Sequence, residues 1–137
     1  MNKVQLAATT KDPETLDVLS RDEDYDVRWN VARNLNTKPE TLDVLSRDKN
    51  SDIRRCVTEN PNTKPKTLDV LSRDEDFNVR YRVAKNPNTK SETLDTLSQD
   101  EDAYVRYCVA ENPNCSERAY KYIMGLELIE SLSKVTT

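Results

Sequence analysis

The sequence contains no histidine and only one glycine, Gly125, in 137 residues. Without histidine, the chain cannot form a Ser-His or Cys-His nucleophilic pair or an imidazole metal site. A single glycine leaves no glycine-rich loop to hold a phosphate and few of the turns that β-hairpins need. The composition therefore predicts a protein that is not an enzyme, has no cofactor or metal site, and is not rich in β-structure.

Long apolar segments are also missing. Apolar residues make up 35% of the chain, below the roughly 45–50% of an average globular protein, so we expect a thin hydrophobic core. No stretch approaches the ~20 apolar residues of a membrane span, and the apolar run near the first residue is too short for a secretory signal. We therefore expect a cytoplasmic protein without a membrane segment.

Cysteine and excess positive charge are scarce as well. The three cysteines, Cys56, Cys108 and Cys115, form no C-x-x-C pair, which predicts free thiols in a chain without a secretory signal. Acidic residues number 25 and basic residues 21, so the net charge is −4. This is not the charge balance of a general nucleic-acid or membrane-surface binder.

What the chain does contain is an internal repeat. The segment Leu-Ser-Arg/Gln-Asp begins at Leu19, Leu45, Leu71 and Leu97, always 26 residues apart. A fixed period of this length is typical of repeat proteins, in which each unit buries its apolar face on its neighbours. We predict a single helical-repeat domain over 1–137, with an N-terminal cap at 1–11, four repeats at 12–115, and a C-terminal capping helix and tail at 116–137.

The first helix of each repeat has a recognisable start. In the second repeat it opens at Thr37-Lys38-Pro39-Glu40. Thr37 is expected to cap this helix and Glu40 to complete a capping box, with the proline in the permissive first turn. In the first repeat, Asp12 is the expected cap.

The second helix of each repeat follows a short acidic loop. Val27 and Val31 lie four residues apart and define a buried stripe that the other repeats reproduce. An Asn-Pro pair follows in three of the four copies, for example at Asn60-Pro61. The residue before a proline is disfavoured in the α region, so this pair ends the helix.

These units resemble the leucine-rich repeat variant group, whose repeats read Asn-Pro-x-Thr-Pro-x-x-Leu-x-x-Leu-x-x-Asp followed by Val-Arg-x-x-Val-Ala. The match extends over four units, from Asp12 to Asn112. The resemblance implies an all-α, right-handed solenoid of two-helix repeats, in which an α-helix alternates with a short α-helix or 3₁₀-helix. It implies little about biochemical role. Helical repeats of the HEAT type are the neighbouring alternative.

One arginine recurs in every second helix, at Arg28, Arg54, Arg80 and Arg106. This ladder suggests a stripe for binding phosphate groups. Each arginine borders the buried arc, however, and each follows an equally constant aspartate. A repeating ion pair between helices or repeats is therefore the simpler interpretation, and the ladder gives only weak support for nucleic-acid binding.

The arc opposite the buried stripe changes from repeat to repeat. Extended binding surfaces of repeat proteins combine such variable positions with a constant frame, and aromatic rings dominate the energetics of interfaces. The alternative is that the rings pack on a neighbouring helix and that the variation is drift. The variable arc consists, slot by slot, of Asp26, Asp52, Asn78 and Tyr104; Trp29, Arg55, Tyr81 and Tyr107; Asn30, Cys56, Arg82 and Cys108; and Arg33, Glu59, Lys85 and Glu111.

From this arc we predict that a protein partner binds the variable face of the second helices. The face carries as many acidic as basic residues, which disfavours nucleic acid as the partner. The predicted partner-binding residues are Trp29, Asn30, Arg33, Arg55, Tyr81, Arg82, Lys85, Tyr104 and Tyr107.

The loops between the two helices of each repeat support a different hypothesis. The four loops at 22–24, 48–50, 74–76 and 100–102 hold ten acidic residues and one lysine. Acids just before a helix are expected as caps, and the loops lack the glycine and the terminal glutamate of a calcium-binding EF-hand. The alternative function is therefore an acidic inhibitor or phosphate mimic that binds a basic protein through this edge.

Overall fold

The computed structural model describes residues 1–136. These residues form ten α-helices and no strand, so the predicted all-α fold is confirmed. Each repeat contributes a seven-residue first helix and a nine-residue second helix. Both helices are α-helical. The shorter helix, for which the resemblance implied either a short α-helix or a 3₁₀-helix, is therefore a short α-helix.

The helix bounds follow the 26-residue period. The first helices of the four repeats are α2 (Pro13–Leu19), α4 (Pro39–Leu45), α6 (Pro65–Leu71) and α8 (Ser91–Leu97). The second helices are α3 (Tyr25–Arg33), α5 (Ser51–Glu59), α7 (Phe77–Lys85) and α9 (Ala103–Glu111). The chain begins with α1 (Lys3–Thr9) and ends with α10 (Glu117–Thr136).

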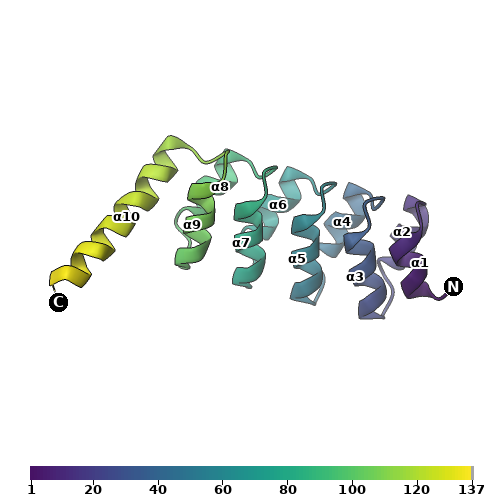
Figure 1. Ribbon diagram of the computed structural model, residues 1–137. Helices are drawn as coiled ribbons and strands as arrows, with labels where there is room; N and C mark the ends of the chain where they lie inside the picture. Colours follow the sequence, from purple (N-terminus) through teal and green to yellow (C-terminus); the bar gives the residue numbers. More distant parts are fainter. Residues whose placement is uncertain (137) are drawn as a thin grey trace. The chain divides into compact units, whose positions relative to one another are not determined.

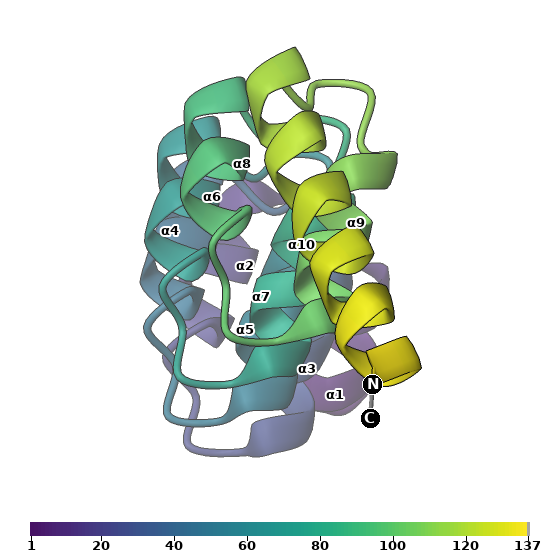
Figure 2. The same ribbon diagram turned by 90° about the vertical axis from the view of Figure 1, so that its left-hand side faces the viewer.

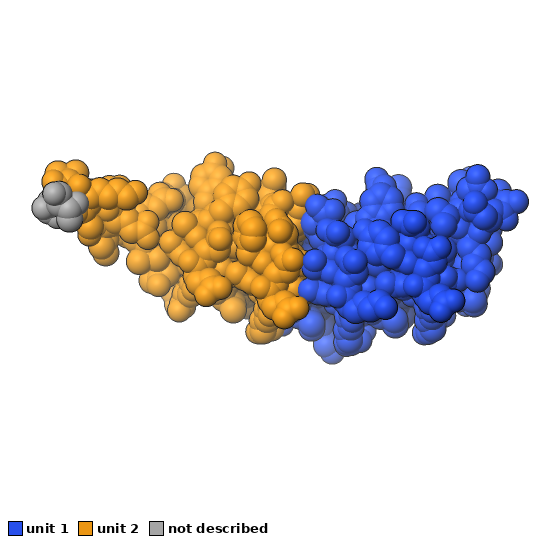
Figure 3. Space-filling view, turned by 90° about the horizontal axis from the view of Figure 1, so that it is seen from below, with its two compact units in different colours: residues 1–71 blue, residues 72–137 orange. Residues whose placement is uncertain are grey.

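The contacts divide the chain into two compact units, residues 1–71 and 72–137, which Figure 3 shows in blue and orange. We call them unit 1 and unit 2. In unit 1 the helices α1, α3 and α5 pack side by side, with the first helices in a second row behind them (Figure 1). In unit 2, α7 and α9 lie side by side, α8 contacts both, and α10 packs on α9. Figure 2 shows in each unit that first and second helices form separate layers.

The core of each unit is thin and lies between these layers. In unit 1, Leu16 and Leu42 on the first helices and Val31 and Val57 on the second helices all have fully buried side chains. Leu94, Val83 and Val109 occupy the matching places in unit 2. The Leu and Val stripes therefore pack as the sequence predicts.

In each unit a buried asparagine links a second helix to the repeat before it. Nδ2 of Asn60 donates to the carbonyls of Ala32 at 2.9 Å and Asn34 at 3.1 Å. In unit 2, Asn112 makes the same two bonds to Ala84 and Asn86, at 2.7 and 2.9 Å. The Ala32 and Ala84 carbonyls lie in the last turn of a helix, where intrahelical donors run out, whereas the Asn34 and Asn86 carbonyls also accept from the amides of Thr37 and Thr89. The Asn-Pro pair thus ends the helix, and its asparagine also links the helix to the repeat before it.

The predicted cap at Thr37 is wrong. The N-cap position of α4 is Lys38, which makes no capping bond through its side chain. Thr37 is buried, and its Oγ1 donates to the carbonyl of Val31 at 2.7 Å. The hydroxyl thus adds a second donor to a carbonyl at the end of the preceding helix, which also accepts from the Asn34 amide at 3.2 Å. In the first repeat the prediction is confirmed, since Asp12 accepts from the amides of Glu14 and Thr15.

The terminal helices take the place of missing repeats. Helix α1 packs on α3, and α10 packs on α9 and buries its own Ile123. Both terminal helices thus contact a second helix of the repeats. Within the described residues, no helix combines the length and the apolar character that a membrane crossing requires.

Candidate functional site

The arginine ladder forms ion pairs between successive repeats. In unit 1, Nε of Arg28 donates to Oδ2 of Asp48 at 2.8 Å, and its Nη1 donates to the carbonyls of Asp22 and Glu23, both at 2.9 Å. The Arg28 and Asp48 side chains are 8% and 7% exposed. Arg28 thus bonds the backbone of its own loop and the carboxylate of the next repeat's loop. A guanidinium held this way is not open to a phosphate.

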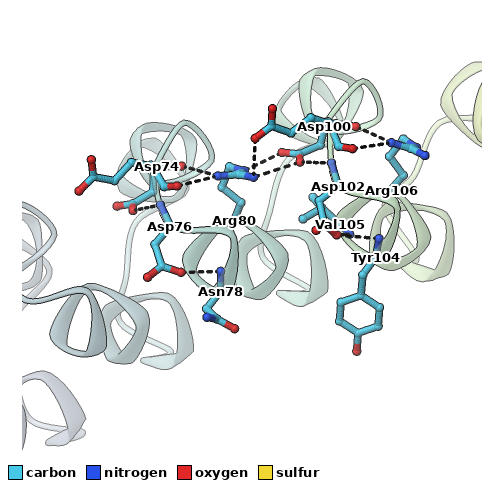
Figure 4. Close-up of polar contacts among 11 residues, drawn as sticks. Asp74, Asp76, Asn78, Arg80, Asp100, Asp102, Tyr104, Val105 and Arg106 are labelled. Atoms are coloured by element: carbon cyan, nitrogen blue, oxygen red, sulfur yellow. Dashed lines mark hydrogen bonds and ion pairs between the residues drawn. The ribbon is translucent and has the colours of Figure 1, made fainter.

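The same arrangement recurs in unit 2, where Figure 4 shows Arg80 between two acidic loops. Its Nη1 donates to the Asp74 carbonyl at 2.9 Å and its Nε to Oδ2 of Asp100 at 2.8 Å. Arg106, the last of the ladder, donates to the Asp100 carbonyl at 2.7 Å and pairs with Glu130 of α10 at 3.4 Å. Helix α10 therefore supplies the acid that a further repeat would provide.

The aspartates of the acidic loops are largely engaged in local structure. Oδ1 of Asp24 accepts from the amide of Asp26 and caps α3, as Asp76 and Asp102 cap α7 and α9. The hydrogen bond from the Asp24 amide, followed by the Lys3 ammonium at 3.0 Å, lowers the pKa of Asp22. In the described part of the chain, no three acidic or cysteine side chains converge on a point that could hold a metal ion.

Four of the predicted partner-binding residues belong to unit 1. Trp29 is half-buried, and the guanidinium of Arg33 lies over its ring at 4.3 Å from the centroid. Asn30 donates to the carbonyl of Asp26 at 2.8 Å, and Arg55 pairs with Asp52 at 3.7 Å. These side chains contact one another and their own helices, so the only ring among them, Trp29, is partly covered.

The other five predicted residues lie in unit 2, and three of them are rings in mutual contact. The ring centroids of Tyr81 and Tyr104 are 5.3 Å apart in an edge-to-face arrangement, and those of Tyr104 and Tyr107 are 6.1 Å apart and nearly parallel. Tyr104 and Tyr107 are 47% and 48% exposed. Arg82 places its guanidinium over the Tyr81 ring at 5.1 Å.

Phe77 extends this group, and sequence reasoning missed it. Its ring centroid lies 5.7 Å from that of Tyr81, and the side chain is 39% exposed. The available signal was its position four residues before Tyr81 on the same helix, a spacing that brings side chains together. We call Phe77, Tyr81, Tyr104 and Tyr107 the aromatic cluster.

A pocket of about 290 Å³ lies beside the aromatic cluster, between α7 and α9. The rings of Tyr104 and Tyr107 line it together with Lys85 from α7 and Glu111 from α9, above Cys108. It brings a cation, a carboxylate and two tyrosine rings together at one point of the surface.

The cysteines on the variable arc are not outward, which corrects the helical-wheel prediction. Cys56 and Cys108 are only 7% and 4% exposed. A single helix viewed alone places them opposite the core, but the second helices pack side by side and cover this slot. Burial raises the pKa of both thiols. All three cysteines are free thiols, as the sequence predicts.

Comparison with models of protein families and with curated proteins finds no match to this chain. The site is therefore interpreted from its own geometry.

Proposed function

We propose that this chain is a non-enzymatic repeat scaffold that binds a protein partner through the aromatic cluster of unit 2. The observation that carries the proposal is the continuous contact of four rings from α7 and α9, of which Tyr104 and Tyr107 are about half exposed. Tyrosine is enriched among the residues that contribute most to binding energy. Soluble proteins rarely expose large apolar patches, and the patches that they do expose often mark interaction sites.

The frame beneath the cluster supports a binding role. Helices α7 and α9 are joined by the buried bonds of Asn112, and the loop before α9 is held by Arg80. The rings therefore stand on a preorganised surface, which reduces the entropy lost on binding. The acidic edge supports the alternative less well, because its aspartates already serve as caps and ion-pair partners.

Two coarser inferences go with this proposal. The repeat motif favours membership of the leucine-rich repeat variant group. The three free thiols favour a reducing compartment such as the cytoplasm, because oxidising compartments promote disulfides.

The test is to capture the partner from a lysate of the source cells and then to measure its affinity in purified form. The variant Tyr81→Ala/Tyr104→Ala/Tyr107→Ala should retain its fold and bind about thirtyfold more weakly, which corresponds to roughly 2 kcal/mol. The matched control is Tyr120→Ala/Tyr122→Ala on α10, because these tyrosines are 48% and 45% exposed but lie outside the cluster. The control should bind like the wild type.

Salt separates this function from binding at the acidic edge. Affinity at the aromatic cluster should change much less with ionic strength than affinity at the acidic edge, because the cluster is surrounded by balanced charges and the rings carry most of the binding energy. A partner on the acidic edge should be lost between low and physiological salt, where exposed charges are screened beyond ~8 Å. Binding of such a partner at the acidic edge should also be weaker in the variant Glu23→Gln. Unchanged binding by a folded triple variant would reject the aromatic cluster as the interface.

A further inference from the structure

The pocket beside the aromatic cluster has a counterpart in unit 1. Both pockets are framed by the same residue types at positions 52 residues apart, which is two repeats. Each has a basic residue on one second helix, and a cysteine, a glutamate and an Asn-Pro pair on the next. The unit 2 frame is Lys85, Cys108, Glu111, Asn112 and Pro113, and the unit 1 frame is Arg33, Cys56, Glu59, Asn60 and Pro61.

The two pockets differ in the residues beside this frame. In unit 2, Tyr104 and Tyr107 stack three residues apart on α9, whereas the same positions in unit 1 hold the ion pair of Asp52 and Arg55. The unit 1 pocket is also smaller, about 130 Å³ against about 290 Å³. We call Tyr104 and Tyr107 the tyrosine wall. The unit 1 pocket has the same frame without this wall and therefore serves as a natural control.

The groups that line the unit 2 pocket are suited to a planar cation. Among the described residues, Glu111 makes no ion pair or hydrogen bond through its carboxylate, although it lines the pocket together with two tyrosine rings. The face of an aromatic ring attracts cations, and guanidinium groups stack on rings more readily than ammonium groups do. The chain shows this pairing twice internally, at Arg33 over Trp29 and at Arg82 over Tyr81.

We propose that this pocket receives an arginine side chain of the protein partner, with the guanidinium stacked on the tyrosine wall and hydrogen-bonded to the Glu111 carboxylate. The inference rests on the proposed function and names the residue type that the aromatic cluster recognises. A carboxylate would gain only Lys85 and would be repelled by the ring faces. Lys85 is exposed and has a long flexible side chain, so it can turn toward solvent when the arginine enters.

The experiment uses the full-length ¹⁵N-labelled chain and a defined probe, the peptide acetyl-Gly-Arg-Gly-amide, followed by amide chemical shifts. The peptide should shift amides of α9 around Glu111 in a saturable way. A peptide with neutral citrulline in place of arginine should bind at least about tenfold more weakly, because it loses the charge-assisted bond. Glu111→Gln should weaken arginine binding by a similar factor, and Lys85→Gln should strengthen it.

The matched variant is Tyr104→Asp/Tyr107→Arg, which gives the unit 2 pocket the side chains that unit 1 already carries at these positions. Since the folded chain accepts this pair in unit 1, the variant should fold, and it should lose the shifts produced by the arginine peptide. Circular dichroism and the denaturation midpoint check its fold. Stronger binding of acetyl-Gly-Glu-Gly-amide at the same amides would overturn the inference, as would arginine-induced shifts confined to the acidic loops.

The two proposals can fail separately. If the arginine peptide does not bind while the triple tyrosine variant still loses its partner, the arginine inference is wrong and the proposed function stands. If the peptide binds the pocket but the triple tyrosine variant binds the partner like the wild type, the arginine-binding pocket is confirmed and the proposed function is wrong.

Discussion

At the scale of single residues, two kinds of side chain link neighbouring repeats within each unit, and they reach in opposite directions along the chain. The arginine of one repeat reaches forward to the aspartate of the next, as Arg28 does to Asp48. The asparagine reaches back to carbonyls of the repeat before, as Asn60 does to Ala32. Both side chains are buried at their polar ends, so losing either one leaves polar groups without partners.

The variant Arg80→Ala should therefore destabilise the chain more than Arg82→Ala does. Arg80 has an 11% exposed side chain that bonds the Asp100 carboxylate and two carbonyls, and its removal leaves a buried carboxylate uncompensated. We expect a loss of about 2–3 kcal/mol for Arg80→Ala and about 1 kcal/mol or less for Arg82→Ala. Urea denaturation midpoints measure both. Equal midpoints would show that the ladder contributes no special stability.

The residue types predicted that the arginines and aspartates form ion pairs, but not whether an arginine pairs with the aspartate of its own repeat or with that of the next repeat. Arginine and aspartate recur with one period, so the sequence shows that they can pair without showing which repeats they join. The role of Asn60 was hidden for a different reason. Proline after an asparagine explains the helix end by itself, whereas the bonds of the amide depend on how closely the next repeat approaches.

At the scale of helices, the first helices differ in how well their N-termini are capped. Helix α2 has Asp12, whose carboxylate accepts from two amides. Helices α4 and α8 begin after Lys38 and Lys90, and neither side chain caps its helix. A lysine there also places a positive charge near the positive end of the helix dipole.

The variant Lys90→Asp should stabilise the chain, because it gives α8 the cap that α2 already has. Its N-cap backbone is extended, with φ −70° and ψ 154°, a geometry suited to a capping aspartate. We expect a gain of about 1 kcal/mol in the free energy of unfolding, measured by urea denaturation. The control Lys90→Gln removes the same charge with a weaker cap and should gain less. A loss of stability would mean that the lysine has another role.

The second helices show where a helical wheel stops being informative. It sorted Val27 and Val31 correctly, because these side chains face the layer of first helices. It placed Cys56 on the outside, although that side chain is buried. The wheel describes one helix and one core, whereas these helices also touch neighbours of their own kind.

At the scale of the whole molecule, the carboxylates link stability to pH. Hydrogen bonds lower the pKa of several of them in the folded state, first from the Thr41 hydroxyl for Asp17 and from the Thr15 hydroxyl for Asp12. A carboxyl with a lowered folded pKa stabilises the fold above its unfolded pKa of about 4. That contribution disappears as the pH falls through the folded value.

We therefore expect the urea midpoint to hold between pH 7 and about 5 and to fall between about pH 4 and pH 2. The variant Asp17→Asn should have a lower midpoint at pH 7 and a smaller drop on acidification, because it cannot be protonated. The matched control is Glu23→Gln, an exposed loop residue, which should leave the acid drop unchanged. A midpoint that stayed constant down to pH 2 would contradict the assignment.

The repeat period and the core were readable from the sequence, because burial imposes the same residue types every 26 positions. The candidate site was readable only in part. The sequence identified Tyr81, Tyr104 and Tyr107 as variable positions. It could not group them with Phe77 or separate them from Trp29, because these relations depend on distances between helices.

The arginine–aspartate ion pairs and the asparagine–carbonyl hydrogen bonds between repeats have a consequence for how such a chain can change in length. A duplicated 26-residue segment would bring its own arginine, aspartate and asparagine, each at the position where its neighbours need a partner. Copying a repeat therefore creates a new junction without orphaning an old one. Recombination within the gene can lengthen or shorten the array by whole repeats, while a shift of a single residue would break both ladders at once.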